Sequence, residues 1–125
     1  MISKMIKTDI IIIGAGPVGL FAVFEAGLLN MKCHLIDILP KPGGQCIELY
    51  PKKPIYDIPA YPEILAGDLI KNLLKQCSQF EPGFTLGERA EKFEKLKDGN
   101  FMITTDKGTR HCAPVVAIAG GLGGF

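Results

Sequence analysis

Hydrophobic and polar positions along the chain change their period several times, and each period predicts one kind of element. Residues 10–13 are four consecutive isoleucines, a run typical of a strand buried on both faces in a parallel sheet. Apolar side chains then recur at helical spacing over residues 17–29 and again over 67–80, which predicts two amphipathic helices. Pro17 suits the first turn of the first helix, and Asn30 suits a left-handed end.

The remaining segments predict strands. Residues 32–37 complete a strand–helix–strand unit of about thirty residues, and residues 84–86 are a short further strand. Three alternating segments, 90–96, 101–105 and 109–112, are separated by Asp98-Gly99 and by Asp106-Lys107-Gly108, turn residues typical of hairpins. Residues 115–119 again have the pattern of a strand buried in a parallel sheet. The predicted class is α/β, a doubly wound parallel sheet with an inserted three-stranded antiparallel β-meander.

Residues 8–19 contain the most informative motif, a G-x-G-x-x-G between the first strand and the first helix. In that context Gly14 permits a tight turn, Gly16 lets the backbone approach a pyrophosphate, and Gly19 lets the helix pack closely on the strand. The free N–H groups and the positive dipole of the helix N-terminus would then face phosphate charges. The alternative is an ordinary glycine-rich turn.

Asp37 ends the second strand of this unit, 23 residues after Gly14. A carboxylate there is placed to accept hydrogen bonds from a ribose diol, and it would repel a 2′-phosphate by roughly 1 to 4 kcal/mol. The site is therefore expected to hold FAD or NAD, with NADP disfavoured. A solvated aspartate at a strand end is the alternative.

A long irregular segment follows Asp37 and favours FAD over NAD. Residues 38–62 contain six prolines and two glycines, and a loop of this length in a compact domain is usually functional or disordered. Gly43, Gly44 and Gln45 can pass close to a ribityl chain or a flavin edge, and Tyr50 can stack on an isoalloxazine face. Each also has an ordinary interpretation, Gly43-Gly44 as a turn and Tyr50 as a core residue.

Composition limits the kinds of protein and of partner that the chain can represent. The 125 residues carry 14 basic and 13 acidic side chains, which gives no general attraction to nucleic acid or membrane. No segment is long enough to span a bilayer and no signal peptide is evident, so we expect a cytoplasmic protein. The cysteines match no zinc template and are expected to be free thiols packed as small apolar groups: Cys33, Cys46, Cys77 and Cys112. His34 and His111 are expected at the surface or at strand edges.

The chain resembles ferredoxin–NADP reductases of the thioredoxin-reductase-like type over essentially its whole length. The dinucleotide motif is generic, but G-G-Q followed by L-Y-P and Y-D-I-P is much more specific. The segments that carry the resemblance are Gly14-Ala15-Gly16-Pro17-Val18-Gly19-Leu20-Phe21-Ala22, Asp37, Gly43-Gly44-Gln45, Leu49-Tyr50-Pro51 and Tyr56-Asp57-Ile58-Pro59.

The resemblance implies a Rossmann-like FAD domain interrupted by an NADPH domain, in a homodimer that passes electrons between NADPH and ferredoxin. It places FAD contacts on Val18, Asp37, Gln45, Tyr50, Ala90 and Phe125, in addition to the glycine motif residues Gly14, Gly16, Pro17, Gly19 and Gly44. Tyr50 corresponds to the flavin-stacking aromatic, and Ala90 would contact the adenine side through its backbone. Lys41, Lys52 and Lys53 either face an acidic electron carrier or are simply solvated.

Against the family pattern, residues 1–125 are expected to be the N-terminal part of an FAD-binding domain, without the NADPH domain and the C-terminal FAD segment. Such a fragment is expected to hold FAD weakly and to lack reductase activity. Three other functions stay open: a thioredoxin-reductase-like disulfide reductase fragment, a non-catalytic nucleotide-binding remnant and an NAD-dependent dehydrogenase domain. A glutathione-reductase-like enzyme would need a cysteine five residues after Cys46, where the chain has Pro51.

Overall fold

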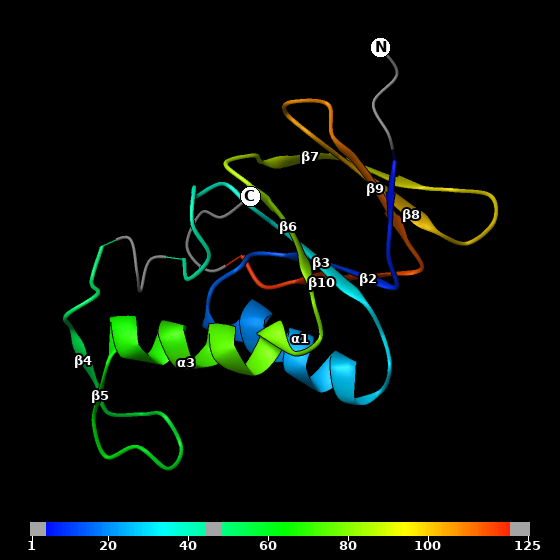
Figure 1. Ribbon diagram of the computed structural model, residues 1–125. Coiled ribbons are helices and arrows are strands. Elements are labelled where there is room, and N and C mark those ends of the chain that lie inside the picture. Colours follow the sequence, from blue (N-terminus) through cyan, green and yellow to red (C-terminus); the bar gives the residue numbers. More distant parts are fainter. Residues whose placement is uncertain (1–4, 45–48, 121–125) are drawn as a thin grey trace.

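A computed structural model describes residues 5–44 and 49–120 (Figure 1). The predicted elements are all present with small differences at their ends, but residues 115–118 form an edge strand with exposed Val115 and Ile118, so their predicted burial is wrong. In chain order the elements are β1 (Ile6–Lys7), β2 (Ile10–Ile13), α1 (Pro17–Leu28), β3 (Cys33–Asp37), β4 (Pro54–Ile55), β5 (Ile64–Leu65), α3 (Ala66–Ser78), β6 (Gly83–Leu86), β7 (Ala90–Lys95), β8 (Phe101–Thr105), β9 (Arg110–Ala113) and β10 (Val115–Ile118).

A parallel sheet in the order β10-β2-β3-β6 forms the centre of the molecule. Strand β2 pairs with β3 on one side, Ile10 opposite Cys33, and with β10 on the other, Ile10 opposite Val115. Its side chains alternate between two cores, because Ile12 packs on one face of the sheet while Ile11 and Ile13 pack on the other. The isoleucine run is thus a central strand buried on both faces, as predicted.

Helices α1 and α3 cover one face of this sheet and pack against each other (Figure 1). Their contact is close at Gly27, where a Cβ atom would collide with the ring of Phe80. The chain turns out of α1 at Asn30, which has a φ of 61°, the left-handed conformation that the sequence predicted.

A second sheet, in the order β1-β9-β8-β7, covers the opposite face. Strands β7, β8 and β9 form the predicted antiparallel meander, and β1 joins it parallel to β9. The α/β class with a parallel sheet and an inserted meander is confirmed. The meander takes the place that a second layer of helices has in simpler doubly wound domains, and Ile103 and Ala113 close the core beneath it.

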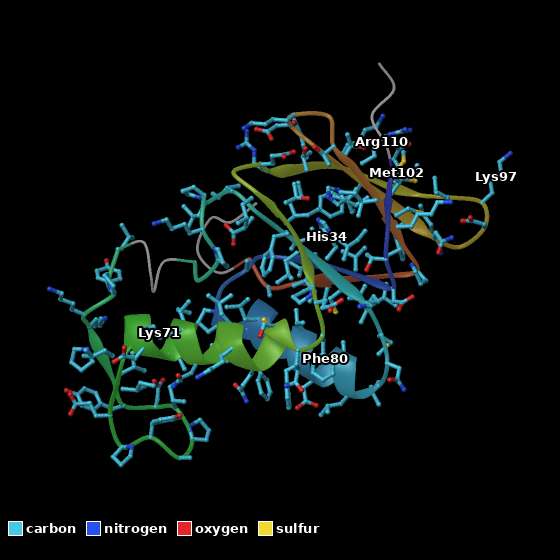
Figure 2. All side chains as sticks on the ribbon, viewed as in Figure 1. His34, Lys71, Phe80, Lys97, Met102 and Arg110 are labelled. Carbon is cyan, nitrogen blue, oxygen red and sulfur yellow. The ribbon has the colours of Figure 1, made fainter. Side chains whose placement is uncertain are left out.

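His111 is buried and His34 is partly buried between the sheets, and neither lies on an edge strand, so the predicted surface or strand-edge positions are wrong. His111 is fully buried, and its ring centroid lies 5.0 Å from that of His34, which is directed from β3 into this layer (Figure 2). The Thr85 hydroxyl joins them, 2.7 Å from His34 Nε2 and 2.8 Å from His111 Nε2. His111 Nδ1 lies 3.3 Å from the Ile103 carbonyl oxygen.

These contacts fix which nitrogens carry protons when both rings are neutral. The Ile103 carbonyl only accepts, so His111 Nδ1 carries the hydrogen and His111 Nε2 accepts from the Thr85 hydroxyl. The Thr85 oxygen then accepts from His34 Nε2–H. Burial lowers the pKa of His34 to about 4, with the nearby His111 adding to the effect. Burial likewise lowers the pKa of His111, although its bond to Ile103 opposes the shift.

Acidification is therefore expected to destabilise the chain between pH 6.5 and about 4. In the unfolded chain both histidines bind protons as the pH falls through 6.5, whereas His34 in the folded chain stays neutral down to about 4. The stability that the neutral histidines contribute is therefore fully present above pH 6.5 and is lost as the pH falls below it. Because His34 is only partly buried, we expect a loss of about 1–2 kcal/mol. Urea denaturation at pH 7 and pH 4.5 measures it. His34→Gln, which keeps a hydrogen-bonding amide, is expected to show a smaller pH-dependent loss than the unmodified chain, and an equal loss would contradict this account.

The described cysteines behave as the sequence predicted, as free thiols. Burial raises the pKa of Cys33 to about 11, with Asp9 contributing, and burial also raises the pKa of Cys77. Both are thus inert small apolar groups. Cys46 lies outside the described residues. Neither described helix is long and apolar enough to cross a membrane.

Candidate nucleotide site

The glycine motif forms a tight loop between β2 and α1. Gly14 has a φ of 111°, and a Cβ atom there would collide with the carbonyl oxygen of Ala119, at the end of β10. A Cβ on Gly19 would collide with the carbonyl oxygen of Gly14. A Cβ on Gly16 would instead point into open space. The first and third glycines thus serve packing, and the second presents bare backbone at the mouth of the loop.

Helix α1 begins directly at this loop, with Gly16 as its N-cap and Pro17 in its first turn. Among the described residues no side chain caps this end of the helix, in contrast to many helix N-termini, whose first amides bond to a side chain. The side chain of Val18 is 71% exposed. This end therefore concentrates positive partial charge beside the bare backbone of Gly16.

Asp37 is buried at the end of β3 and fastens the loop. Its Oδ2 accepts a hydrogen bond from the Ala15 amide at 2.7 Å, and its Oδ1 accepts from the Leu39 amide at 3.0 Å. The sequence predicted the position of this carboxylate but not these backbone contacts. Two carboxylate oxygens offer about four acceptor positions, so the contacts leave capacity for a further donor such as a ribose hydroxyl.

The second glycine pair lies against the first loop. The Gly43 amide donates to the Ala15 carbonyl at 2.6 Å, and a Cβ on Gly44 would lie 3.2 Å from the Cα of Gly16. Both glycines have positive φ, 121° and 60°. Two segments that are far apart in the sequence thus meet at Gly16. Gln45 lies outside the described residues.

Ala90 begins β7, and its side chain is buried between the sheets. The segment just before Ala90 is hydrogen-bonded to the segment around the end of β3. The Gly87 amide donates to the Leu39 carbonyl at 3.0 Å, and the Glu88 amide donates to the Asp37 carbonyl at 3.2 Å. Ala90 is therefore tied to the same end of β3 as Asp37, and its side chain points away from the surface. Phe125 lies outside the described residues.

Tyr50 belongs to a different neighbourhood, beside the N-terminus of α3. Its side chain is 51% exposed, so it is not the core residue that its alternative interpretation required. Lys53 Nζ lies 5.3 Å from the centroid of the Tyr50 ring. No sequence pattern predicted this pair, although a lysine three residues after an aromatic in a turn is a usable signal.

An apolar groove of about 830 Å³ adjoins the start of α1. Val18 and Phe21 form one wall, and the loop at Ile58 and the side of α3 at Leu73 form the others. This groove was not predicted from the sequence. The signal was present, because Val18 and Phe21 are one helical turn apart on the exposed side of α1.

Comparison with known proteins agrees with the resemblance seen in the motifs. No protein-family profile matches the chain. It is 76% identical over 121 residues to ferredoxin–NADP reductase 2 of Christiangramia forsetii, covering 97% of this chain and 34% of that protein. It is 72% identical over 121 residues to the ferredoxin–NADP reductase of Flavobacterium johnsoniae, covering 97% and 35%.

Among solved structures, thioredoxin reductase from Streptococcus pyogenes is similar in fold, with a TM-score of 0.76 at 24% identity, covering 90% of this chain and 34% of that one. The chain spans about a third of the length of the curated relatives that it matches. Over nearly its whole length, then, the chain is closely similar in sequence to part of ferredoxin–NADP reductases and in fold to part of a thioredoxin reductase, in agreement with its motifs.

Proposed function

We propose that the chain binds FAD and forms part of a flavin-dependent ferredoxin–NADP reductase. The observation that carries the proposal is the meeting of the two glycine segments at Gly16, next to the uncapped start of α1. Bare backbone on both sides and a helix N-terminus suit a pyrophosphate. Asp37, fastened to the same loop, suits an adenosine ribose without a 2′-phosphate.

The proposed contact residues would bind different parts of the FAD molecule. Gly14 and Gly19 shape the loop, while Gly16, Pro17, Val18 and Gly44 receive the pyrophosphate. Tyr50 stacks on the flavin, Ala90 meets the adenine side through its backbone, and Gln45 and Phe125 complete the flavin contacts by resemblance. The bound flavin supplies the redox chemistry, because it accepts two electrons and releases them singly. This chain's residues bind and orient it.

The activity of the whole enzyme, its substrates and its partners follow from the named relatives. We infer electron transfer between NADPH and ferredoxin or a similar carrier, in a cytoplasmic homodimer. Lys41, Lys52 and Lys53 are candidates to attract an acidic carrier. NADPH contacts are expected in a separate domain, because Asp37 disfavours a 2′-phosphate in the site described above.

Other functions remain distinguishable. A thioredoxin-reductase-like disulfide reductase fragment would share this fold, and its identity would depend on a dithiol elsewhere. A non-catalytic nucleotide-binding remnant and an NAD-dependent dehydrogenase domain would both be colourless. The contact of Gly43 and Gly44 with the first loop favours FAD, since a simple NAD domain usually starts another short strand–helix unit there.

Purified 125-residue protein is expected to bind FAD weakly and to show no NADPH-driven dye reduction, because its relatives are about three times longer. Titration with FAD, followed by flavin fluorescence and visible absorption, tests binding, and a dye assay tests turnover. NAD as the preferred ligand would favour the dehydrogenase alternative. Steady NADPH-dependent turnover would contradict the expected lack of activity, and absence of FAD binding would overturn the proposed cofactor.

A further inference from the structure

The turn that carries Tyr50 is fastened to the N-terminus of α3. The Lys53 amide donates to the Tyr50 carbonyl at 3.1 Å and closes the turn. The Gly67 amide donates to the Pro51 carbonyl at 2.7 Å, and the Ala66 amide donates to the Lys53 carbonyl at 2.9 Å. No side chain from residues 5–44 or 49–120 caps the start of α3, and these carbonyls accept from its first amides instead.

The turn and the helix are closely packed where they meet. A Cβ on Gly67 would come within 3.0 Å of the Pro51 carbonyl oxygen, tighter than side chains normally tolerate. The backbone on both sides of Lys53 is therefore held against a helix that is itself packed on the core through Leu69 and Ile70. The backbone of the Tyr50 turn is fixed, and what remains to be set is the orientation of the ring.

Lys53 supplies that restraint. Its ammonium nitrogen lies 5.3 Å from the ring centroid, within the range of a cation–π interaction. About half of the Tyr50 side chain stays exposed, enough for a planar ligand to stack on the ring. The ammonium group also attracts the ring's π electrons and makes the ring a weaker electron donor.

We propose that Lys53 is a positioning residue, which orients Tyr50 for stacking on the flavin and lowers the ring's donor strength toward it. The inference rests on the proposed function, in which Tyr50 is the stacking aromatic. It gives Lys53 a role beyond general attraction of an acidic carrier. Its charge is placed on a ring, whereas a merely solvated lysine would make no such contact.

The experiment compares Lys53→Met with Lys53→Arg and Lys71→Met in the 125-residue chain. Methionine keeps the apolar stem and removes the charge, arginine restores a cation, and Lys71 is an exposed lysine on α3 (Figure 2). We expect Lys53→Met to weaken FAD binding about two- to fivefold, the size of an exposed cation–π contact. It should also change the quenching of bound flavin fluorescence, because a freer and more electron-rich ring is the quencher. Lys53→Arg should restore both, and Lys71→Met should change neither.

A double-mutant cycle with Tyr50→Leu tests whether Lys53 affects FAD binding through the Tyr50 ring or by direct contact with the flavin. If Lys53 acts through the ring, Lys53→Met has no further effect in the Tyr50→Leu background. An undiminished effect there would mean that Lys53 acts on the flavin directly and would overturn the inference, as would a Lys53→Met variant that behaves like Lys71→Met. FAD binding unchanged by Tyr50→Leu, or no binding by the unmodified chain, would instead defeat the proposed function and this inference with it.

Discussion

Gly14→Ala is expected to lower the free energy of unfolding by about 3 kcal/mol and to abolish measurable FAD binding. Two costs add at this position. An alanine at a φ of 111° is strained by about 1–2 kcal/mol, and its Cβ would collide with the Ala119 carbonyl, an overpacking cost of about 1–3 kcal/mol. Because Ala119 is hydrogen-bonded to Ile13 through its amide, it is held in place, and the loop has to move instead.

Gly99→Ala is the matched control. Gly99 also has a positive φ, 92°, but nothing lies within 4 Å of its Cβ position. It should cost only the conformational strain, about 1–2 kcal/mol, and leave FAD binding unchanged. Urea denaturation gives the free energy of unfolding of both variants, and an FAD titration gives their affinities. The difference between the two variants measures the effect of the collision with Ala119. Equal stabilities would show that β10 does not approach the loop as closely as described.

Asp37→Ala is expected to weaken FAD binding about 10- to 100-fold. The carboxylate anchors the loop through Ala15 and Leu39 and is the proposed acceptor for the ribose. Hydrogen bonds to charged groups contribute about 1.5–3 kcal/mol each, and 1.4 kcal/mol is a tenfold change in affinity. Isothermal titration with FAD measures the loss.

Asp98→Ala provides the comparison, because the Asp98 carboxylate accepts the Asn100 amide in the β7–β8 turn, away from the glycine loops. It should leave FAD affinity unchanged. Asp37→Asn adds a test of specificity: with the negative charge removed, the preference for NAD over NADP as competing ligands should shrink. A preference that survives intact would mean that another group excludes the 2′-phosphate.

Local patterns predicted most of the fold, because strands β2 and β3 and both helices have periods that their own side chains reveal. Strands β1, β4 and β5 were missed, since strands of two residues carry no period. The positions of the two histidines between the sheets were missed for a different reason. His34 and His111 lie on strands of different sheets, and only the stacking of the two sheets brings them to one threonine.

The site was predictable to a similar degree. Spacing placed the glycine loop and Asp37, because both rely on residues within one strand–helix–strand unit. Spacing did not reveal that Asp37 bonds the Ala15 amide or that Gly43 bonds the Ala15 carbonyl, since backbone groups have no sequence signature. The Lys53–Tyr50 contact depends on how a turn docks on α3, which likewise leaves no periodic signal.

The central place of β2 has a consequence for how the chain folds. Ile10 pairs with Cys33 and also with Val115, so one neighbour of β2 follows soon after it in the chain while the other comes near residue 120. During synthesis the strand–helix–strand unit can assemble early, but one edge of the isoleucine strand stays open until β10 has been made. Contacts between such distant residues slow folding, and an open isoleucine edge invites association with other chains. Strand β10, which is made much later in the chain, is therefore the strand that covers this edge of β2.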